Sequence, residues 1–480
     1  MAVLYRFSRD LRLDDHAGLA AAAELGEIVP LLIIDESTRE RISCSPRRAA
    51  FYCAAVAALA DALAQRGAQL IVRRGPLAAS TLAVAKETAA SAVVWSASYS
   101  APWIALERDL QSRLEERGLR GVMVHDAPAV PPEETAVEKT SRGEGYRALV
   151  PYIQTWRDLD VAAYEAPLFM RFARPAVQSE ALPSPDEFGA SEIQLVASPA
   201  GATAQLARFL EADALHYSSA VNVPADDRTS HLAAHLSFGT ISARTIVREA
   251  KRRIDDPFLL TEERASLKKY LAALAHRDFF LQLAWFHPET QKMALQEKMR
   301  NFPFSKTHVA LEAWQRGLTG YPLVDAGIRQ LHATGWMHPR VRSIAASFLC
   351  FDLGVEWRAG LYEWDRHLVE DDEALAIGNW QWIAGVGADL AAYPRIYNPL
   401  KQERRFDPHG AYVRQWVPEL AHRVGSALRV RQTRSLELPL FGPNVYPQPV
   451  VDHELAAREF LARYTAFITD VGGSSRQSNR

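Results

Sequence analysis

Hydrophobic positions near the start of the chain form short runs that are separated by longer amphipathic stretches. The runs that we expect to be strands are Ala2–Phe7, Ile28–Ile34, Gln69–Val72, Ala92–Trp95 and Gly121–Val124. The stretches between them carry alanine and leucine at helical spacing and lie at Ser45–Arg66, Leu77–Ala89 and Ile104–Arg117. Strands that alternate with helices predict an α/β domain with a doubly wound parallel sheet over residues 1–130.

The pattern changes twice along the rest of the chain. Residues 131–200 are rich in proline, glutamate, serine and alanine and predict a long connector, in which the segment from Gly143 to Trp156 is expected to pack. Strand signals nearly vanish over residues 201–475, where an all-helical domain is predicted. The expected helices are Ala202–Glu211, Thr240–Ile254, Glu262–Phe286, His308–Gly317, Tyr321–Thr334 and Val341–Phe351. Thr261 and Gly335 supply capping signals for two of them.

Composition narrows the class of protein without selecting a function. The 480 residues are 48% hydrophobic and 23% charged, as in an ordinary globular protein. The three cysteines, Cys44, Cys53 and Cys350, form no CxxC pair, so neither a disulfide framework nor a metal site is expected. We find no secretory signal and no apolar run of about 20 residues. A cytoplasmic protein without a membrane segment is therefore expected.

The net charge of −2 gives no overall signature of nucleic-acid binding, but cations are concentrated locally. The segments His338–Arg342 and Lys401–Arg405 are consistent with a basic groove on a near-neutral protein.

Polar residues also lie at the end of the first expected strand and just after it, at the edge where doubly wound sheets bind ligands. They are Arg6, Arg9, Asp10 and Arg12. A solvated loop is at least as good an interpretation, because no glycine-rich phosphate turn is present.

Several motifs carry chemistry, and each one alone is weak. The segment around Thr229 and Ser230 is expected to open a helix, where hydroxyls and backbone amides can hold phosphate, although a simple N-cap is the favoured alternative. Trp314 and Trp336 are more often core residues than functional ones. The cluster Glu370–Asp372 is usually a structural ion pair when it finds an arginine such as Arg342.

The order of the motifs is more specific than any one of them. The second half of the chain contains, in sequence, Tyr321–Ala326, Thr334–His338, Ala346–Leu349, Asn379–Trp382 and Arg395–Pro399. This succession resembles the flavin domain of class I DNA photolyases and cryptochromes. The segment Arg9–Leu13, followed by Asp15 and His16, is similar to the opening of that family. The resemblance covers nearly the whole chain.

The resemblance implies an α/β antenna-type domain, a long linker and a helical domain that binds FAD. Residues implied to hold FAD are Tyr217, Thr229, Ser230, His231, Leu232, Tyr270, Arg277, Arg342, Glu370, Asp371, Asp372 and Ala376. Arg342 is expected to pair with Glu370, where the family has aspartate. Ala376 replaces the asparagine that faces the flavin N5 in most photolyases, so the stable flavin redox state is expected to differ.

In repair enzymes of the family, light drives electron transfer from reduced FAD to a pyrimidine dimer that has been flipped out of DNA. By resemblance, Ala273 and His276 replace the glutamate and tryptophan that read the dimer, and Pro339 replaces an asparagine. The second histidine of animal-type (6-4) photolyases is replaced by Ser343. Trp382 survives of the lesion-facing platform, while Arg340 and Gln402 are expected to contact DNA, with Lys401 and Arg405 either holding phosphates or forming a solvated face.

The resemblance also implies a path of three tryptophans for reduction of FAD by light. Trp380 and Trp357 match its first two members, but Phe304 replaces the third and is too hard to oxidise. Photoreduction is expected to be impaired or rerouted, for instance through a tyrosine. The loop from Ser96 to Glu107 lacks the pair of residues associated with folate binding and is only loosely similar to the deazaflavin type, so an antenna chromophore is in doubt.

Three functions are compatible with this sequence. The first is a light-driven DNA repair lyase acting on UV-damaged DNA as a monomer. The second is a cryptochrome-like blue-light photoreceptor without repair activity, whose signalling partner the sequence does not name. The third is a flavoprotein that transfers electrons or binds DNA without light, and the retention of Trp357 and Trp380 makes it the weakest of the three.

Overall fold

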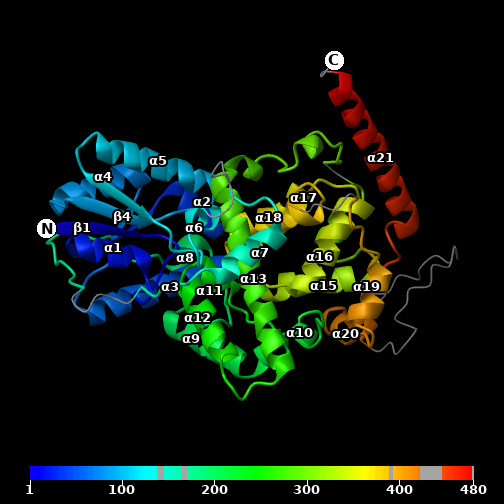
Figure 1. The fold of residues 1–480 in the computed structure, drawn as a ribbon, viewed down its shortest axis with the longest axis horizontal. Helices are drawn as coiled ribbons and strands as arrows, with labels where there is room; N and C mark the ends of the chain where they lie inside the picture. The colour runs from blue at the N-terminus through cyan, green and yellow to red at the C-terminus, as the bar shows by residue number, and fades with distance from the viewer. Residues whose placement is uncertain (138–144, 165–169, 307, 389–392, 422–445, 478–480) are drawn as a thin grey trace. The chain divides into compact units, whose positions relative to one another are not determined.

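The computed structural model describes residues 1–137, 145–164, 170–306, 308–388, 393–421 and 446–477 (Figure 1). Its backbone divides into two compact units, and each unit combines segments that are distant in sequence. Unit 1 contains Met1–Ser218, Arg228–Gln291 and Leu368–Leu375, and unit 2 contains Ser219–Asp227, Lys292–His367 and Ala376–Arg480. These units are defined by packing. The functional domains 1–130, 131–200 and 201–475 stay a prediction.

Unit 1 contains a five-stranded parallel sheet with the order β3-β2-β1-β4-β5. The strands are β1 (Ala2–Phe7), β2 (Glu27–Ile34), β3 (Ile71–Arg74), β4 (Ala92–Ser96) and β5 (Arg120–Val124). Because the chain moves outward first to one side of β1 and then to the other, the sheet is doubly wound as predicted. The third strand starts two residues later than the predicted Gln69–Val72, since the pairing partners of β2 begin at Ile71.

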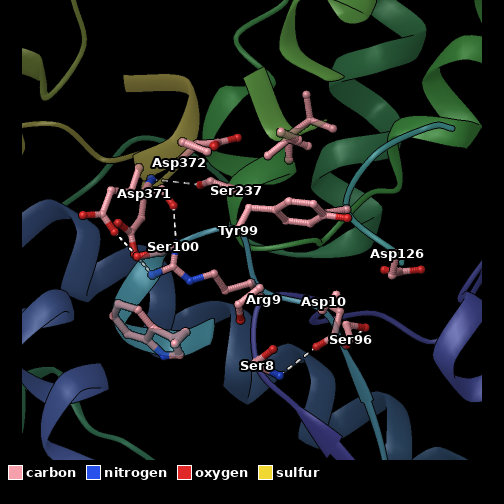
Figure 2. Close-up of a pocket in the computed structure, with 18 of the residues that line it drawn as sticks. Ser8, Arg9, Asp10, Ser96, Tyr99, Ser100, Asp126, Ser237, Asp371 and Asp372 are labelled. Carbon is pink, nitrogen blue, oxygen red and sulfur yellow. Dashed lines mark hydrogen bonds and ion pairs between the residues drawn. The ribbon is translucent and has the colours of Figure 1, made fainter. Parts of the chain in front are cut away.

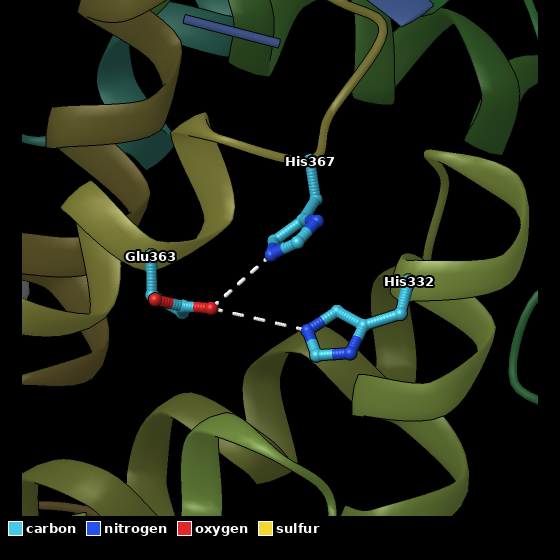
Figure 3. A group of neighbouring side chains, drawn as sticks. All are labelled: His332, Glu363 and His367. Atoms are coloured by element: carbon cyan, nitrogen blue, oxygen red, sulfur yellow. Dashed lines mark hydrogen bonds and ion pairs between the residues drawn. The ribbon is translucent and has the colours of Figure 1, made fainter. Parts of the chain in front are cut away.

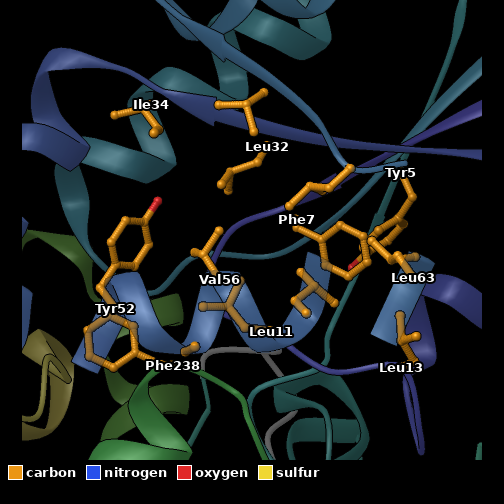
Figure 4. Close-up of a cluster of buried hydrophobic side chains, with 14 of the residues drawn as sticks. Tyr5, Phe7, Leu11, Leu13, Leu32, Ile34, Tyr52, Val56, Leu63 and Phe238 are labelled. Atoms are coloured by element: carbon orange, nitrogen blue, oxygen red, sulfur yellow. The ribbon is translucent and has the colours of Figure 1, made fainter. Parts of the chain in front are cut away.

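Side chains on successive strand positions point to opposite faces of the sheet, and each face has its own helical cover. On one face, β1 contributes Val3, Tyr5 and Phe7 to a core that contains residues of α1 (Ala17–Leu25) and α3 (Pro46–Gln65). Figure 4 shows Val56 and Leu63 of α3 packed in this core with Leu11 and Phe238. On the other face, Leu4 packs with residues of α4 (Leu77–Glu87) and α5 (Ala101–Glu115).

The remaining described elements are helical. Unit 1 adds α2 (Glu36–Ser43), α6 (Pro132–Val137), α7 (Leu149–Asp158), α8 (Pro185–Phe188), α9 (Pro199–Arg208), the π-helical turn η1 (Phe209–Asp213), α11 (Ala233–Ser237), α12 (Ala243–Ile254), α13 (Thr261–Phe286) and η2 (Pro288–Gln291). Unit 2 contains η3 (Glu297–Met299), α14 (Leu311–Gln315), α15 (Pro322–Thr334), α16 (Pro339–Ser347), the π-helical turn η4 (Phe348–Asp352), α17 (Trp357–Asp365), α19 (Pro399–Phe406), α20 (Ala411–Trp416), η5 (Pro418–Leu420) and α21 (His453–Gln477). Two helices begin in one unit and end in the other, α10 (Ala214–Ala220) and α18 (Glu373–Ile383).

Local chemistry explains where three of the predicted helix ends lie in the structure. Thr261 is the first residue of α13 rather than its cap, and Glu263 accepts a hydrogen bond from the backbone N–H of Leu260 at 2.8 Å instead. Gly335 does end α15 in the left-handed region, at φ 74°. The predicted helix Val341–Phe351 starts earlier, at Pro339, whose fixed φ suits a first turn.

The connector after β5 is tied to α13 by one buried carboxylate. Asp278 accepts hydrogen bonds from the backbone N–H of Ala129 at 2.8 Å and from the indole N–H of Trp156 at 3.0 Å. Trp156 on α7 is buried, so the predicted segment packs from Gly145 on, while its first two residues, Gly143 and Glu144, lie outside the described residues. Burial raises the pKa of Asp278 to about 6, although the nearby Arg277 and these hydrogen bonds lower it.

A second buried carboxylate, Asp126, fastens the carboxyl edge of the sheet to α12. Arg12 forms two hydrogen bonds with it, at 2.7 and 2.8 Å, and Arg244 donates a third at 2.7 Å. The backbone N–H of Ala17 at the start of α1 donates to the same carboxylate at 3.0 Å. Burial alone would raise the pKa of Asp126, but Arg12 and Arg244 hold it well below its ordinary value. None of the described helices is long and apolar enough to cross a membrane.

We expect Asp126→Asn to lower the free energy of unfolding by about 3–5 kcal/mol, because it leaves two arginines without their buried counter-charge. Asp109→Asn is the matched control, since Asp109 pairs with Arg113 at 2.9 Å with both side chains 47% exposed. The control should change stability by less than about 1 kcal/mol. Urea unfolding followed by circular dichroism measures both, and equal losses in the two variants would contradict this role for Asp126.

Candidate functional site

The polar residues at the end of β1 and just after it are not part of a solvated loop, since Arg6, Asp10 and Arg12 are buried and Arg9 is partly buried. Arg6 is paired with Glu107 at 2.9 Å, and Arg12 is paired with Asp126. Asp10 accepts hydrogen bonds from the Ser96 hydroxyl at 2.6 Å and from the backbone N–H of Ser8 at 2.7 Å. The solvated-loop interpretation is therefore wrong, and these groups build the carboxyl edge of the sheet.

A cavity of about 60 Å³ opens at this edge, between the ends of β1 and β4. This is the point where the strand order reverses, and it is where doubly wound sheets bind ligands. Figure 2 shows the side chains of Arg9, Tyr99 and Ser237 around it, together with Asp371 and Asp372. The cavity is far smaller than the roughly 300–1,000 Å³ of a typical ligand site. Side chains of the protein itself occupy this edge.

Asp371 is the centre of charge beside this cavity. Its buried carboxylate faces Arg9 at 2.6 Å, is hydrogen-bonded by Arg41 and lies 3.8 Å from Arg48. Burial would raise the pKa of Asp371, but Arg41, Arg9 and Arg48 hold it far below its usual range. The segment is also fixed by its backbone, since the N–H of Asp371 donates to the Ser237 hydroxyl at 3.1 Å. Three arginines thus satisfy the carboxylate that the sequence assigned to the cofactor.

The two residues that flank Asp371 in sequence also contact arginines. Asp372 lies 3.3 Å from the Arg277 guanidinium and accepts a hydrogen bond from the backbone N–H of Leu375 in the first turn of α18. The backbone carbonyl of Glu370 accepts a hydrogen bond from Arg48 at 3.2 Å. The structure thus brings together Arg277 and Asp372 from the predicted set. The predicted pairing of Glu370 with Arg342 joins residues of different units and stays a prediction.

Tyr217 and Tyr270 form a second group in unit 1. Their rings are 5.5 Å apart and nearly perpendicular, and Phe209 in the turn η1 lies 4.6 Å from the Tyr270 ring. Burial raises the pKa of Tyr217 to about 12, and it also raises the pKa of Tyr270, beside Ser230. Both phenols therefore stay protonated and can donate hydrogen bonds. The turn η1, which carries Phe209, is π-helical, and π-helical turns within α-helices often occur at functional sites.

The loop Thr229–Leu232 precedes α11 directly. The N-cap position of α11 is Leu232, which makes no side-chain capping bond, so the favoured alternative of a cap by Thr229 or Ser230 is wrong. His231 takes a left-handed backbone conformation with φ 50°, which is uncommon for a residue other than glycine. Hydroxyls and backbone N–H groups in such a loop fit the chemistry of phosphate.

The two replaced lesion contacts lie on α13. Ala273 is exposed and His276 is partly buried, three residues further along the helix and hence on the same side of it. The His276 ring lies 4.9 Å from that of Phe280. Burial lowers the pKa of His276 to about 4, so the imidazole is neutral at pH 7.

In unit 2, the predicted DNA contacts lie near the start of α16 and on α19. Pro339 is the exposed first residue of α16. The Arg340 guanidinium donates two hydrogen bonds to the Asn222 side-chain oxygen, at 2.9 and 2.6 Å, and lies 4.8 Å from the centre of the Phe406 ring. Gln402 is partly buried on α19. Arg342 donates a hydrogen bond to the backbone carbonyl of Met337 at 2.7 Å.

Two of the predicted tryptophans, Trp357 and Trp380, lie in or against α17. Trp357 begins this helix, and Trp357 and Trp380 are both buried, whereas Trp382 and Ala376 are partly buried on α18. Gly360 allows the Trp380 ring to approach, since a Cβ at this position would lie 2.1 Å from it. Trp380 therefore packs against the middle of α17.

A fourth tryptophan, which the sequence analysis missed, lies in the same group. Trp364 is seven residues after Trp357, close to two helical turns, so both point to the same side of α17. The Trp364 ring is 4.4 Å from the Trp380 ring and is stacked on Trp314 at 6.3 Å. The seven-residue spacing of the two tryptophans was the available signal. Trp314 is fully buried and donates its indole N–H to the backbone carbonyl of Ala345 at 3.0 Å, which agrees with its predicted core role.

Phe304 lies in a cluster of phenylalanines. Its ring is 4.7 Å from Phe302 and 6.0 Å from Phe460. Tyrosine is also present here, because Tyr464 lies 6.2 Å from Phe302 and 6.3 Å from the exposed Tyr393.

The chain combines a doubly wound parallel sheet with many helices, and its match to a family of FAD-binding domains makes it an FAD-binding protein. The family model for DNA photolyase matches residues 3–168, and the one for the FAD binding domain of DNA photolyase matches residues 270–466. The chain belongs to the DNA photolyase family. It is 34% identical to the deoxyribodipyrimidine photo-lyase of Halobacterium salinarum over 96% of this chain and 98% of that one.

Solved structures give the same assignment. A bacterial class III photolyase from Agrobacterium tumefaciens matches with a TM-score of 0.83 and 28% identity, over 97% of each chain. The cryptochrome of Synechocystis sp. PCC6803 matches with a TM-score of 0.84 and 26% identity, over 97% of this chain and 98% of that one.

We expect the stability difference between the protein and Asp371→Asn to depend on pH. The folded pKa of Asp371 is depressed, so its contribution is complete above the unfolded value of about 3.9 and is lost as the pH falls toward the folded pKa. The variant should be clearly less stable at pH 7, and the difference should shrink below pH of about 4. Urea unfolding at several pH values tests this, with Asp109→Asn as the control. A difference that stays constant down to pH of about 3 would contradict it.

Proposed function

We propose that this protein is a light-driven DNA repair lyase that uses FAD and reads its lesion with an altered set of residues. The observation that carries the proposal is the cationic side of α19, where Lys401, Arg404 and Arg405 are exposed and spaced by three or four residues. Such spacing places their side chains along one side of the helix, next to Gln402. Phosphate groups of DNA bind cations arranged in this way.

The groups that would hold FAD fall into three sets. Thr229, Ser230 and the backbone of the loop before α11 would bind its phosphates, with Tyr217 and Tyr270 as protonated donors beside them. Arg277 and Asp372 would bind the ribityl and ring region. Arg342 and Glu370 would flank the isoalloxazine, which Ala376 leaves without an amide partner at N5.

Bound, reduced FAD would supply, in light, the electron that splits a pyrimidine dimer, and the electron would return to the flavin after the split. The protein has to extrude the dimer, exclude water and orient it. The donors available for this differ from the family pattern, because Ala273 and Pro339 offer no side-chain hydrogen bond. Neutral His276 can donate one hydrogen bond and accept another, and Trp382 can stack on a base. Losing a charge-assisted hydrogen bond costs about 1.5–3 kcal/mol, so the lesion is expected to be read largely by shape and stacking.

Arg340 would act on the DNA backbone rather than on the lesion. Its guanidinium is oriented by Asn222 and lies over Phe406. Arg405 also lies near this ring, at 5.1 Å. One aromatic ring thus positions two cations, which favours a phosphate-binding role over a freely solvated face.

The alternative function is a blue-light photoreceptor without repair. The presence of Ala273, His276 and Pro339, where repair enzymes of the family have other residues, favours it, together with the similarity to a cryptochrome structure.

An antenna chromophore would need a cavity of sufficient volume. A cavity of about 430 Å³ at the carboxyl ends of β2 and β3 has the volume of a ligand site, unlike the cavity of about 60 Å³ between β1 and β4. The absorption spectrum of the purified protein would show any second pigment.

The deciding experiment illuminates the chemically reduced protein with oligonucleotides that carry one lesion each, a cyclobutane dimer or a (6-4) photoproduct. We expect blue light to restore intact bases in one of them, because the flavin is already reduced and needs no internal electron path. Chromatography of the digested DNA measures the product, and a dark sample is the control. A protein that binds FAD and responds to light, yet repairs neither lesion, would replace this proposal by the photoreceptor.

We further expect electrons for photoreduction to reach Trp380 through Trp364, whose ring lies 4.4 Å away, which avoids Phe304. Trp364→Phe should slow flavin reduction several-fold under blue light with an external reductant, while FAD content and melting temperature stay close to those of the parent. Trp416→Phe is the matched control, since Trp416 lies in α20 and is partly buried. Equal photoreduction rates in the two variants would instead favour the tyrosine route past Tyr464.

A further inference from the structure

Three side chains from two helices of unit 2 meet at a point that the proposed repair function does not use. His332 lies in the last turn of α15, Glu363 lies in α17, and His367 follows the end of α17. Figure 3 shows the carboxylate of Glu363 directed toward both imidazole rings. One ligand atom from each residue lies within 4.8 Å of the other two. The sequence analysis expected no metal site on the basis of the cysteines alone and did not consider these three residues.

The distances within this group are close to those of a zinc site. Glu363 Oε1 lies 3.2 Å from His367 Nε2 and 3.9 Å from His332 Nε2. Ligand atoms about 2.0–2.1 Å from a tetrahedral ion lie about 3.3 Å from one another. The pair of Glu363 and His367 already has this spacing, and His332 needs to approach the Glu363 carboxylate by about half an ångström.

The donor set also has the right chemistry. Two imidazole nitrogens and one carboxylate form a recognised ligand set for zinc, which leaves a fourth position for water. The side chains of His332 and His367 are 33% and 30% exposed, so an ion can reach them, while Glu363 is only 11% exposed. The second oxygen of Glu363 accepts a hydrogen bond from the Gln315 side chain at 3.3 Å, which orients the carboxylate in the way that supporting residues do at metal sites.

The alternative is a hydrogen-bonded group without an ion. The hydrogen bond from His367 lowers the pKa of Glu363, with His332 and Arg366 nearby adding to the effect, although burial opposes it. A charged carboxylate beside two imidazoles is stable in either case. The nearby Arg366 opposes a second positive charge, so moderate rather than very high affinity is expected.

We propose that His332, Glu363 and His367 bind one divalent transition-metal ion of the zinc type. The ion joins the end of α15 to the end of α17. The helix α17 carries both Trp357 and Trp364, so the ion fixes the helix against which Trp380 packs. Its role is to stiffen this part of unit 2 and not to react with substrate.

The test uses the full chain with its flavin, without a histidine tag, after treatment with a chelator. Zinc titration by calorimetry should give one site per chain, and cobalt should give the intense visible bands of a tetrahedral site. His332→Ala, His367→Ala and Glu363→Gln should each weaken zinc binding at least roughly tenfold. His409→Ala, a change at an exposed histidine in the same unit, should leave binding unchanged.

Thermal melting separates loss of the site from loss of the fold. Zinc should raise the melting temperature of the parent and of His409→Ala, since a ligand that binds the folded state stabilises it. It should not raise that of Glu363→Gln, whose metal-free melting temperature should match the parent. Zinc binding that is weak in the parent, or that survives all three substitutions, would overturn the proposal.

Discussion

The architecture of unit 1 depends on buried carboxylates that are neutralised by arginines. Asp126 joins the loop after β1, the start of α1 and the helix α12, and it does so because Arg12 and Arg244 remove most of the energetic cost of burying its charge. Asp371 has the same relation to Arg9, Arg41 and Arg48. Both carboxylates lie at the carboxyl edge of the sheet, where related folds accept ligands. This edge therefore serves as a structural joint as well as the wall of a small cavity.

The patterns of hydrophobic residues were sufficient to predict the sheet and most helices. Four of the five strands begin within a residue of the predicted positions, because β-branched runs between helical stretches leave few alternatives. Errors arose where a backbone group is satisfied by a distant or unexpected partner, as at Leu260 and Glu263. The solvated loop that the sequence analysis allowed at the end of β1 was also wrong. Arginines and aspartates in a short segment suggest exposure to solvent, and only the folded structure shows that their ion-pair partners lie in other elements.

The candidate site was predicted less completely than the fold. The resemblance assigned Arg277, Asp372, Tyr217 and Tyr270 to the cofactor without pairing them, and the structure brings Arg277 to Asp372 and Tyr217 to Tyr270. The three arginines around Asp371 come from segments that no local pattern connects. The same holds for Trp364 and for the group of His332 with Glu363. Long-range neighbours of this kind depend on how helices pack, and periodicity within one helix carries no information about them. The roles of the predicted site residues in binding FAD and DNA stay proposals, which membership of the photolyase family supports.

Gly360 lies three residues after Trp357 and four before Trp364, and the Trp380 ring occupies the space that its missing side chain leaves. Trp380, the first tryptophan of the predicted path, thus lies on α18 with its ring against the middle of α17. A Cβ at position 360 would lie 2.1 Å from this ring, so any larger residue there has to displace Trp380. Because the Trp380 ring also lies 4.4 Å from that of Trp364, the same change would disturb the spacing of these two tryptophans.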